Sequence, residues 1–285
     1  DAQGTLTSNG ALNLRANTLT LDNASTQAGQ ITVNAGTLSN RAGSLAQSGH
    51  GAMTVTVTGA LDNSGGSMAS NGALAVQAAQ VTNAQGKLLA AADSTFSLTS
   101  NGGLNNQQGQ IAGGYLAVNT GTQAINNLQG VFAATSQLAI QSGSLNNDGG
   151  LLQSGGALSL NTHGAALSNR NSGDNGGILS QGNLLISSGA LDNSSGVLVG
   201  GSTSQLSTAA LNNQQGQLIS QGALTLISQA LNNQAGLVQS GDTLALNTQG
   251  QTLTNTDSGD AGGILSQGAC LLYTSPSPRD MRRCR

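Results

Sequence analysis

The stretch that decides the fold lies between residues 211 and 236, which read LNNQQGQLISQGALTLISQALNNQAG. The tripeptide Leu-Asn-Asn begins at Leu211 and begins again at Leu231, 20 residues later. Between the two copies, short apolar runs are separated by Gly and by amide side chains. A fixed repeat of this length indicates that the chain is built from stacked copies of one small unit.

The same unit can be followed along most of the chain. Each copy starts with an aliphatic anchor residue, continues with Asp, Asn, Ser or Thr, and has Asn at its third position, with a spacing near 20 residues. Asn tolerates left-handed backbone and can both donate and accept hydrogen bonds, so it can occupy a bend and stack on itself. We therefore expect a ladder of asparagines that bridges successive coils. Its predicted members are Asn23, Asn40, Asn63, Asn83, Asn106, Asn127, Asn147, Asn169, Asn193, Asn213, Asn233 and Asn255.

Two further features of the unit predict turns and strands. A glycine usually follows five residues after the anchor, as at Gly216 and Gly236, where it is expected to allow a turn. The second half of each unit then alternates apolar and polar residues, as in 224–226 and 244–246. Alternation with a period of two predicts short strands with one buried face.

Units of this kind cannot bury their apolar faces alone and must stack. We therefore predict an all-β fold, a parallel β-helix (β-solenoid) of about 12 to 13 coils with a period near 20 residues. The alternative is a leucine-rich repeat, which also has an Asn column and a similar period. That fold spends part of each repeat on a helical segment, whereas here Gly and Asn fill the interval and strands follow.

The composition limits the core and the partners. Aromatic residues are 1% of the chain, Trp is absent, and 42 residues are Gly, so we expect a narrow aliphatic core with many turns. Charged residues are only 7%, and four of the eight Lys and Arg residues fall in the last seven positions. A body so poor in cations is not expected to bind nucleic acid. No apolar run approaches the length of a membrane span, so the chain is not expected to be membrane-spanning.

The last residues differ from the rest. Residues 270–285, CLLYTSPSPRDMRRCR, contain both Cys and both Pro, and the repeat stops at Ala269. One interpretation is a cap for the stack. We favour another, in which 1–269 is an internal fragment of a β-helix shaft and 270–285 is an unrelated tail of adapter or sequencing origin.

Particular units resemble a known family. LDNSGGSMASNGALAVQA at 61–78 and LNNQQGQLISQGALTLISQA at 211–230 resemble the haemagglutinin repeats of filamentous-haemagglutinin-type exoproteins. The resemblance extends over residues 1–269. It implies a right-handed parallel β-helix that is secreted by two-partner secretion in Gram-negative bacteria and projects from the cell surface.

The resemblance also implies partners and roles. An outer-membrane two-partner-secretion transporter would export the chain, and a receptor or glycan on host or bacterial cells would be its target. Similar shafts serve cell adhesion in adhesins and display a C-terminal toxin in contact-dependent growth inhibition. The repeats alone leave these roles open.

The sequence supplies little catalytic chemistry. His50 and His163 have no companion ligand at metal-binding spacing, so we expect both in surface turns. Asp174 and Asp260, in two copies of an SGD-x-GG insertion, are weak candidates for a calcium site, and a plain turn is the simpler interpretation. We predict no catalytic residue and no cofactor. The alternative function is a glycan-active β-helix enzyme, which would need paired carboxylates in a groove.

Overall fold

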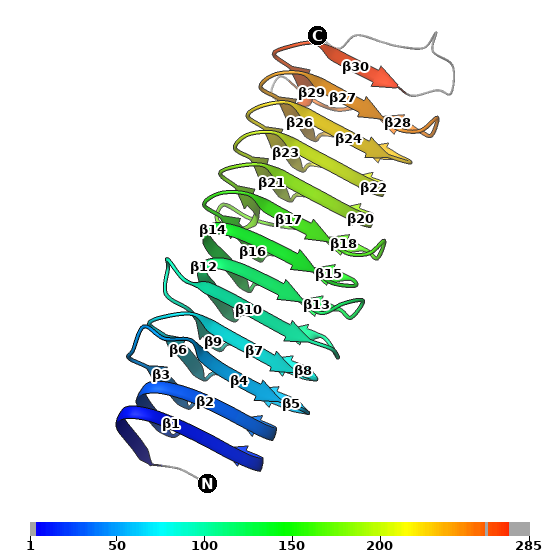
Figure 1. Ribbon diagram of the computed structural model, residues 1–285. Helices are drawn as coiled ribbons and strands as arrows, with labels where there is room; N and C mark the ends of the chain where they lie inside the picture. The colour runs from blue at the N-terminus through cyan, green and yellow to red at the C-terminus, as the bar shows by residue number, and fades with distance from the viewer. Residues whose placement is uncertain (1–3, 260–261, 274–285) are drawn as a thin grey trace. The chain divides into compact units, whose positions relative to one another are not determined.

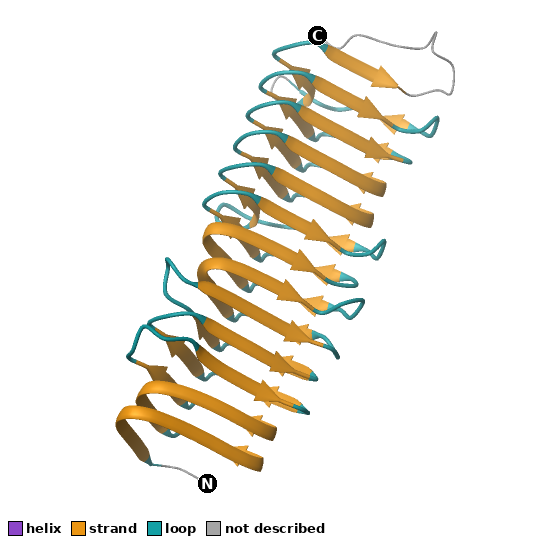
Figure 2. Ribbon diagram, in the orientation of Figure 1, coloured by secondary structure: helices purple, strands orange, loops and turns teal. Residues whose placement is uncertain are grey.

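The structure is a computed structural model that describes residues 4–259 and 262–273. It divides into two compact units, Asp1–Gly143 and Ser144–Arg285. Every regular element of the described residues is a β-strand, as Figure 2 shows. The predicted all-β parallel β-solenoid is confirmed, with about 12 turns of about 20 residues. The leucine-rich alternative is wrong, because no helical segment occurs among the described residues.

In the first unit, strands of successive turns lie one above another and pair in parallel (Figure 1). The strands of this unit are β1 Thr5–Thr20, β2 Ser25–Ser39, β3 Ser44–Gln47, β4 Met53–Val57, β5 Ala60–Asp62, β6 Ser67–Ser70, β7 Leu74–Ala78, β8 Gln80–Thr82, β9 Lys87–Leu89, β10 Thr95–Ser100, β11 Leu104–Asn105, β12 Gln110–Asn119, β13 Ile125–Asn126 and β14 Val131–Gln141.

The second unit repeats this arrangement with strands that also pair in parallel with their equivalents one turn away. Its strands are β15 Leu145–Asn146, β16 Leu151–Ser154, β17 Leu158–Asn161, β18 Leu167–Ser168, β19 Gly177–Ser180, β20 Leu184–Asp192, β21 Val197–Gly200, β22 Ser204–Asn212, β23 Gln217–Ser220, β24 Leu224–Ser228, β25 Leu231–Asn232, β26 Leu237–Ser240, β27 Leu244–Asn247, β28 Leu253–Thr254, β29 Gly263–Ser266 and β30 Cys270–Tyr273. β30 falls on the tail side of the predicted boundary, and residues 274–285 of the predicted tail lie outside the described residues.

The core consists of columns of apolar side chains, and each turn contributes one side chain to each column. Strands such as β4 alternate buried and half-buried residues along their length. Parallel in-register pairing therefore places each buried side chain on its counterpart in the next turn. One column of the first unit and one of the second contain only fully buried residues: Leu45, Met68, Leu88, Ile111 and Phe132, then Leu152, Ile178, Leu198, Leu218 and Val238.

Each turn bends at three corners, and the corner after the anchor residue holds the asparagines. We call this the asparagine corner: the ladder Asn and the three residues after it, such as 213–216. Its left-handed residue is not the Asn but the second residue after it, as at Gln215 with φ 54° and Ala235 with φ 52°. Asn213 and Asn233 therefore occupy the bend without adopting the left-handed conformation that Asn tolerates.

The glycine of this corner is required by close approach. A Cβ on Gly216 would lie 2.2 Å from the carbonyl oxygen of Asn193 in the previous turn. It would also lie 2.6 Å from Oδ1 of Asn213 in its own turn. The glycine therefore lets the backbone pass against the stacked Asn side chains, and Gly216 has no positive φ.

Candidate functional site: the asparagine corner

The Asn side chains at this corner bond to one another from turn to turn. In the first unit, the Nδ2 group of each Asn donates to Oδ1 of the next at 2.7 Å, through Asn40, Asn63, Asn83, Asn106 and Asn127. In the second unit the same bond measures 2.7 to 2.8 Å, through Asn147, Asn169, Asn193, Asn213, Asn233 and Asn255. All of these residues except Asn255 are fully buried.

Most Asn residues of the ladder also close their own turn and reach the next one, as Asn213 does. Asn213 Nδ2 donates to Asn233 Oδ1 at 2.7 Å, to the carbonyl of Gly216 at 3.2 Å and to that of Leu237 at 3.0 Å. Its Oδ1 accepts the bond from Asn193 Nδ2 at 2.7 Å. A shorter polar side chain could not make both inter-turn bonds and the intra-turn bond.

The structure corrects one predicted member of the ladder. β1 pairs with β2 so that Leu19, and not Leu21, lies opposite the anchor Leu38. Leu21 consequently occupies the ladder position and is buried, while Asn23 is exposed with φ 56° in the left-handed position. The ladder of the first unit therefore begins at Asn40, whose buried Oδ1 has no hydrogen-bond partner.

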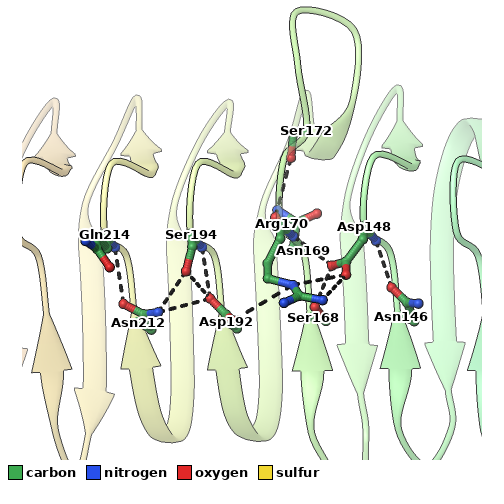
Figure 3. A network of polar contacts seen from close by, with 10 residues as sticks. All are labelled: Asn146, Asp148, Ser168, Asn169, Arg170, Ser172, Asp192, Ser194, Asn212 and Gln214. Carbon is green, nitrogen blue, oxygen red and sulfur yellow. Dashed lines mark hydrogen bonds and ion pairs between the residues drawn. The ribbon is translucent and has the colours of Figure 1, made fainter.

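Charged residues gather on the outer side of the corner in the second unit, as Figure 3 shows. Arg170 bonds Oδ2 of Asp148 through Nη2 at 2.6 Å and through Nε at 3.0 Å, and its Nε lies 3.9 Å from Oδ2 of Asp192. Asp148 Oδ1 accepts from the Arg170 backbone N at 3.0 Å and from the Ser168 hydroxyl at 2.5 Å. Three successive turns are thus joined on their outer surface.

The first unit contains a matching arrangement. Asp22 Oδ1 accepts from the backbone N of Arg41 at 2.9 Å and from the hydroxyl of Ser39 at 2.6 Å. Arg41 Nε then bonds Asp62 Oδ2 at 2.6 Å. Asp62 also accepts from the N and hydroxyl of Ser64, at 2.9 and 2.5 Å. The pattern Asp, Arg, Asp therefore occurs in three successive turns of each unit.

These contacts change the acidity of the carboxyl groups. Partial burial on its own would raise the pKa of Asp148, but hydrogen bonds from Arg170 and Ser168 and the positive charge of Arg170 outweigh it and lower that pKa. The pKa of Asp62 is lowered in the same way, against the effect of burial, by Ser64 and Arg41. Both carboxylates are therefore held ionised as hydrogen-bond acceptors, which suits a structural role at the turn.

The other two corners use hydroxyl groups, which the sequence analysis missed. We call the corner that begins at Ser220 and its equivalents the serine corner. There, Ser220 Oγ bonds the Ala223 carbonyl at 3.1 Å and the Ser202 carbonyl of the previous turn at 2.8 Å. At the third corner, Thr248 Oγ1 bonds the Gln251 carbonyl at 2.9 Å. A regular signal was present, since Ser70, Ser154, Ser220 and Ser240 each follow a ladder Asn by seven residues.

The remaining predicted positions lie on the surface. Asp174 is exposed in the turn of the SGD-x-GG loop, and Asp260 lies outside the described residues. His50 and His163 are exposed in turns. No group of three or more His, Cys, Asp or Glu side chains within residues 4–259 and 262–273 is placed to hold a metal ion.

A shallow groove of about 430 Å³ lies beside the serine corner of the second unit. Its lining includes the amide side chains of Gln153, Gln181 and Gln221 and the apolar side chains of Leu179 and Val199. Leu179 and Val199 are neighbours in the pairing of β19 with β21 and point outward, half-buried. The groove is therefore lined by both apolar and amide side chains.

The geometry defines a class of protein: a repeat β-solenoid whose corners are fixed by stacked polar side chains. The chain matches the haemagglutinin repeat over residues 1–65, 65–108, 111–174, 161–228 and 204–269. Because these matches include most of the sequence, the chain belongs to the haemagglutinin repeat family, and the resemblance to a filamentous-haemagglutinin-type repeat region is confirmed. Neither the curated proteins nor the solved structures gave a match to it. A long apolar helix of the kind that crosses a bilayer does not occur in the described part of the chain.

Proposed function

We propose that the chain is the structural shaft of a secreted, surface-exposed protein that serves cell adhesion or displays a C-terminal toxin in contact-dependent growth inhibition. Its export would use an outer-membrane two-partner-secretion transporter. Its target would be a receptor or glycan on a host or bacterial cell. Membership of the haemagglutinin repeat family supports an adhesin-like shaft, and the particular role is our proposal.

The observation that carries the proposal is the equivalence of the turns. Inter-turn bonds of the ladder differ by only 0.1 Å within the two units, and the apolar columns keep one register. A stack of this kind contacts only its neighbours and can be lengthened turn by turn, which suits a spacer. We therefore propose a structural role for the stacked turns and assign the shaft no catalytic step.

Contact with a target would then be distributed over outward-facing residues. Amide side chains line the groove at the serine corner, and others stack on the asparagine corner, where Gln85 bonds Gln108 at 3.0 Å. Many weak contacts along equivalent turns would bind with a combined avidity that no single contact supplies.

The test measures binding and turnover side by side. The purified chain is assayed for binding to bacterial and epithelial cells and for release of reducing sugar from cell-surface polysaccharide. Two double variants accompany it: Asp174→Ala with Asp260→Ala, and Gln181→Ala with Gln221→Ala. Binding without turnover that falls only partly in either variant supports the shaft. Turnover that one variant abolishes would establish the glycan-active enzyme instead.

Adhesion and toxin display are separated by the flanking reading frame. A downstream effector domain would support toxin display, and binding modules without one would support adhesion. A fusion of the chain to a reporter domain, expressed with a cognate transporter, would test surface exposure directly. Reporter retained inside the cell would contradict the proposed localisation.

A further inference from the structure

Four Asn residues are followed directly by Gly: Asn9, Asn71, Asn101 and Asn175. Asn-Gly is the dipeptide in which a side-chain amide is most open to attack by the next backbone nitrogen, because Gly has no side chain to block the approach. Asn is accordingly among the thermolabile residues of proteins. Attack requires a Gly N–H that is free and a backbone that can close a five-membered ring.

Three of the four dipeptides hold the glycine N–H in a hydrogen bond. Gly72 N donates to Ser70 Oγ at 3.1 Å, and the Asn71 side chain itself donates to the Ser48 carbonyl at 3.1 Å. Gly102 N donates to the Ala79 carbonyl of the previous turn. Gly10 N, within β1, donates to Ser8 Oγ at 3.2 Å. Each bond competes with the attack and keeps the backbone in place.

Asn175 differs from the other three. It is exposed, and neither its side chain nor the N–H of Gly176 makes a hydrogen bond within the described residues. It lies in the SGD-x-GG loop, which leaves the solenoid beyond Ser172, as Figure 3 shows. Exposure alone does not set Asn175 apart from the other three. Asn101 and Gly102 are also exposed, and yet their backbone N–H groups are hydrogen-bonded.

The loop is fixed firmly at both ends. Ser172 is buried, and its Oγ accepts from the N of Val197 at 3.1 Å. At the other end, the N of Gly177 donates to the Gly150 carbonyl at 2.8 Å, and the Gly177 carbonyl accepts from Asn147 Nδ2 at 3.4 Å. The segment from 173 to 176 can therefore change its chemistry without loss of these bonds.

We propose that Asn175 is a spontaneous deamidation site, which converts the loop from SGDNGG to a form with two adjacent carboxylates. The Gly176 nitrogen loses its proton to water or hydroxide and bonds to Cγ of Asn175. The Cγ–Nδ2 bond breaks, and the amide leaves as ammonia with a proton from solvent. Water then opens the cyclic imide at either carbonyl to give Asp or isoaspartate.

The product would change the outer surface and not the stack. The new carboxylate lies next to Asp174, so the charge of the loop doubles on one side of the second unit. Because the anchoring bonds at Ser172 and Gly177 involve neither Asn175 nor Gly176, the melting temperature should stay constant. Any effect on the binding of a target would therefore report the surface alone.

The experiment follows all four dipeptides in one sample. The folded full chain is incubated in mildly alkaline buffer, and peptide mapping by mass spectrometry measures the gain of one dalton at each Asn over time. A parallel sample is unfolded in urea, which removes the hydrogen bonds of the folded chain and leaves only the local sequence, Asn followed by Gly, at all four sites. We expect conversion at Asn175 several-fold faster than at Asn71 and Asn101 in the folded chain, and similar rates at the four sites in urea.

Equal rates in the folded chain, or faster conversion at Asn71 or Asn101, would overturn the proposal. The Asn175→Asp variant tests its second part: an unchanged melting temperature is expected, with Asn71→Asp as the matched control that loses a bonded side chain. A drop in the melting temperature of Asn175→Asp as large as that of the control would contradict the separation of the loop from the stack.

Discussion

Asn213 lies inside the ladder of the second unit, so its replacement by Ala removes one member of the ladder and tests that member alone. The change removes the bond to Asn233 and the bond from Asn193, both at 2.7 Å, in a fully buried position. Asn193 Nδ2 keeps two carbonyl acceptors, those of Gly196 and Gln217. Asn233 Oδ1 loses its donor and remains buried.

The expected cost follows from that asymmetry. A buried acceptor without a partner costs about 1 to 3 kcal/mol, and each lost hydrogen bond adds roughly 0.5 to 1.5 kcal/mol. Because such terms do not add fully, we expect Asn213→Ala to lower the free energy of unfolding by about 2 to 4 kcal/mol. Equilibrium unfolding in urea, followed by circular dichroism, measures it.

The adjacent Asn212 supplies the control. It is half-buried, and its side chain bonds Asp192 and Ser194 on the outer surface, where water can replace the lost partners. Asn212→Ala should therefore cost less than about 1 kcal/mol. Equal losses for the two variants would refute the argument that the buried ladder, and not the turn as a whole, stabilises the stack.

Three further predictions concern packing, charge and the tail. Ser204 occupies a position of a buried column where the next turn has Leu224, and its buried hydroxyl has no hydrogen-bond partner. A Cβ on Gly200 would lie 2.1 Å from that hydroxyl oxygen, so the two residues are replaced together. Gly200→Ser together with Ser204→Leu should raise the unfolding free energy by about 1 to 3 kcal/mol in urea titrations, and a neutral result would contradict the column argument. The pKa of Asp148 is lower in the folded chain than in the unfolded chain, so the ionised carboxylate adds stability that is fully present above the unfolded pKa of about 4. This stability is lost as the pH falls through the lower pKa of the folded chain. Arg170→Gln should therefore make the melting temperature depend less steeply on pH in the acid range. Removal of residues 274–285 should leave the melting temperature unchanged. Removal of β30 as well should lower the melting temperature, because β30 pairs with β27. A lower melting temperature after the first deletion, with no further change after the second, would disprove this.

The columns could be predicted from the sequence because stacking forces like residues over one another. The anchor positions Leu191, Leu211 and Leu231 pair in the register that the spacing predicted. Insertions did not disturb the prediction, since the extra residues leave the stack at loops and the strands return to the same register. The serine column followed the same rule and could have been found by the same search.

Position 21 shows where the pattern was ambiguous. Residues 19–23 read LTLDN, so Leu-x-Asn can start at Leu21, while Leu19 also fits as an anchor. The sequence pattern favours the start that ends in Asn. The pairing of β1 with β2 instead places Leu19 opposite Leu38 and leaves Asn23 exposed. The register is therefore set by the pairing of the whole of β1 with β2, and not by the hydrogen bonds that the Asn23 side chain could make in the ladder.

The sequence analysis missed the outer charge clusters, although the repeat aligns part of each cluster. Asp148 and Arg170 each directly follow a ladder Asn and therefore lie at equivalent positions of neighbouring turns, whereas Asp192 precedes a ladder Asn in the turn after that. Their sequence separation depends on the loop insertions between them. The lowered pKa of Asp148 likewise depends on contacts that only the stacked arrangement creates.

Hydrogen exchange of the Asn side-chain amides tests the central claim most directly. With the ¹⁵N-labelled chain, NMR can follow each NH₂ group after transfer to D₂O. The fully buried ladder residues, Asn40 to Asn233, should be strongly protected, while exposed residues such as Asn23, Asn101 and Asn175 should exchange at once. Rapid exchange of the ladder amides in the folded chain would contradict a hydrogen-bonded column of asparagines in each unit.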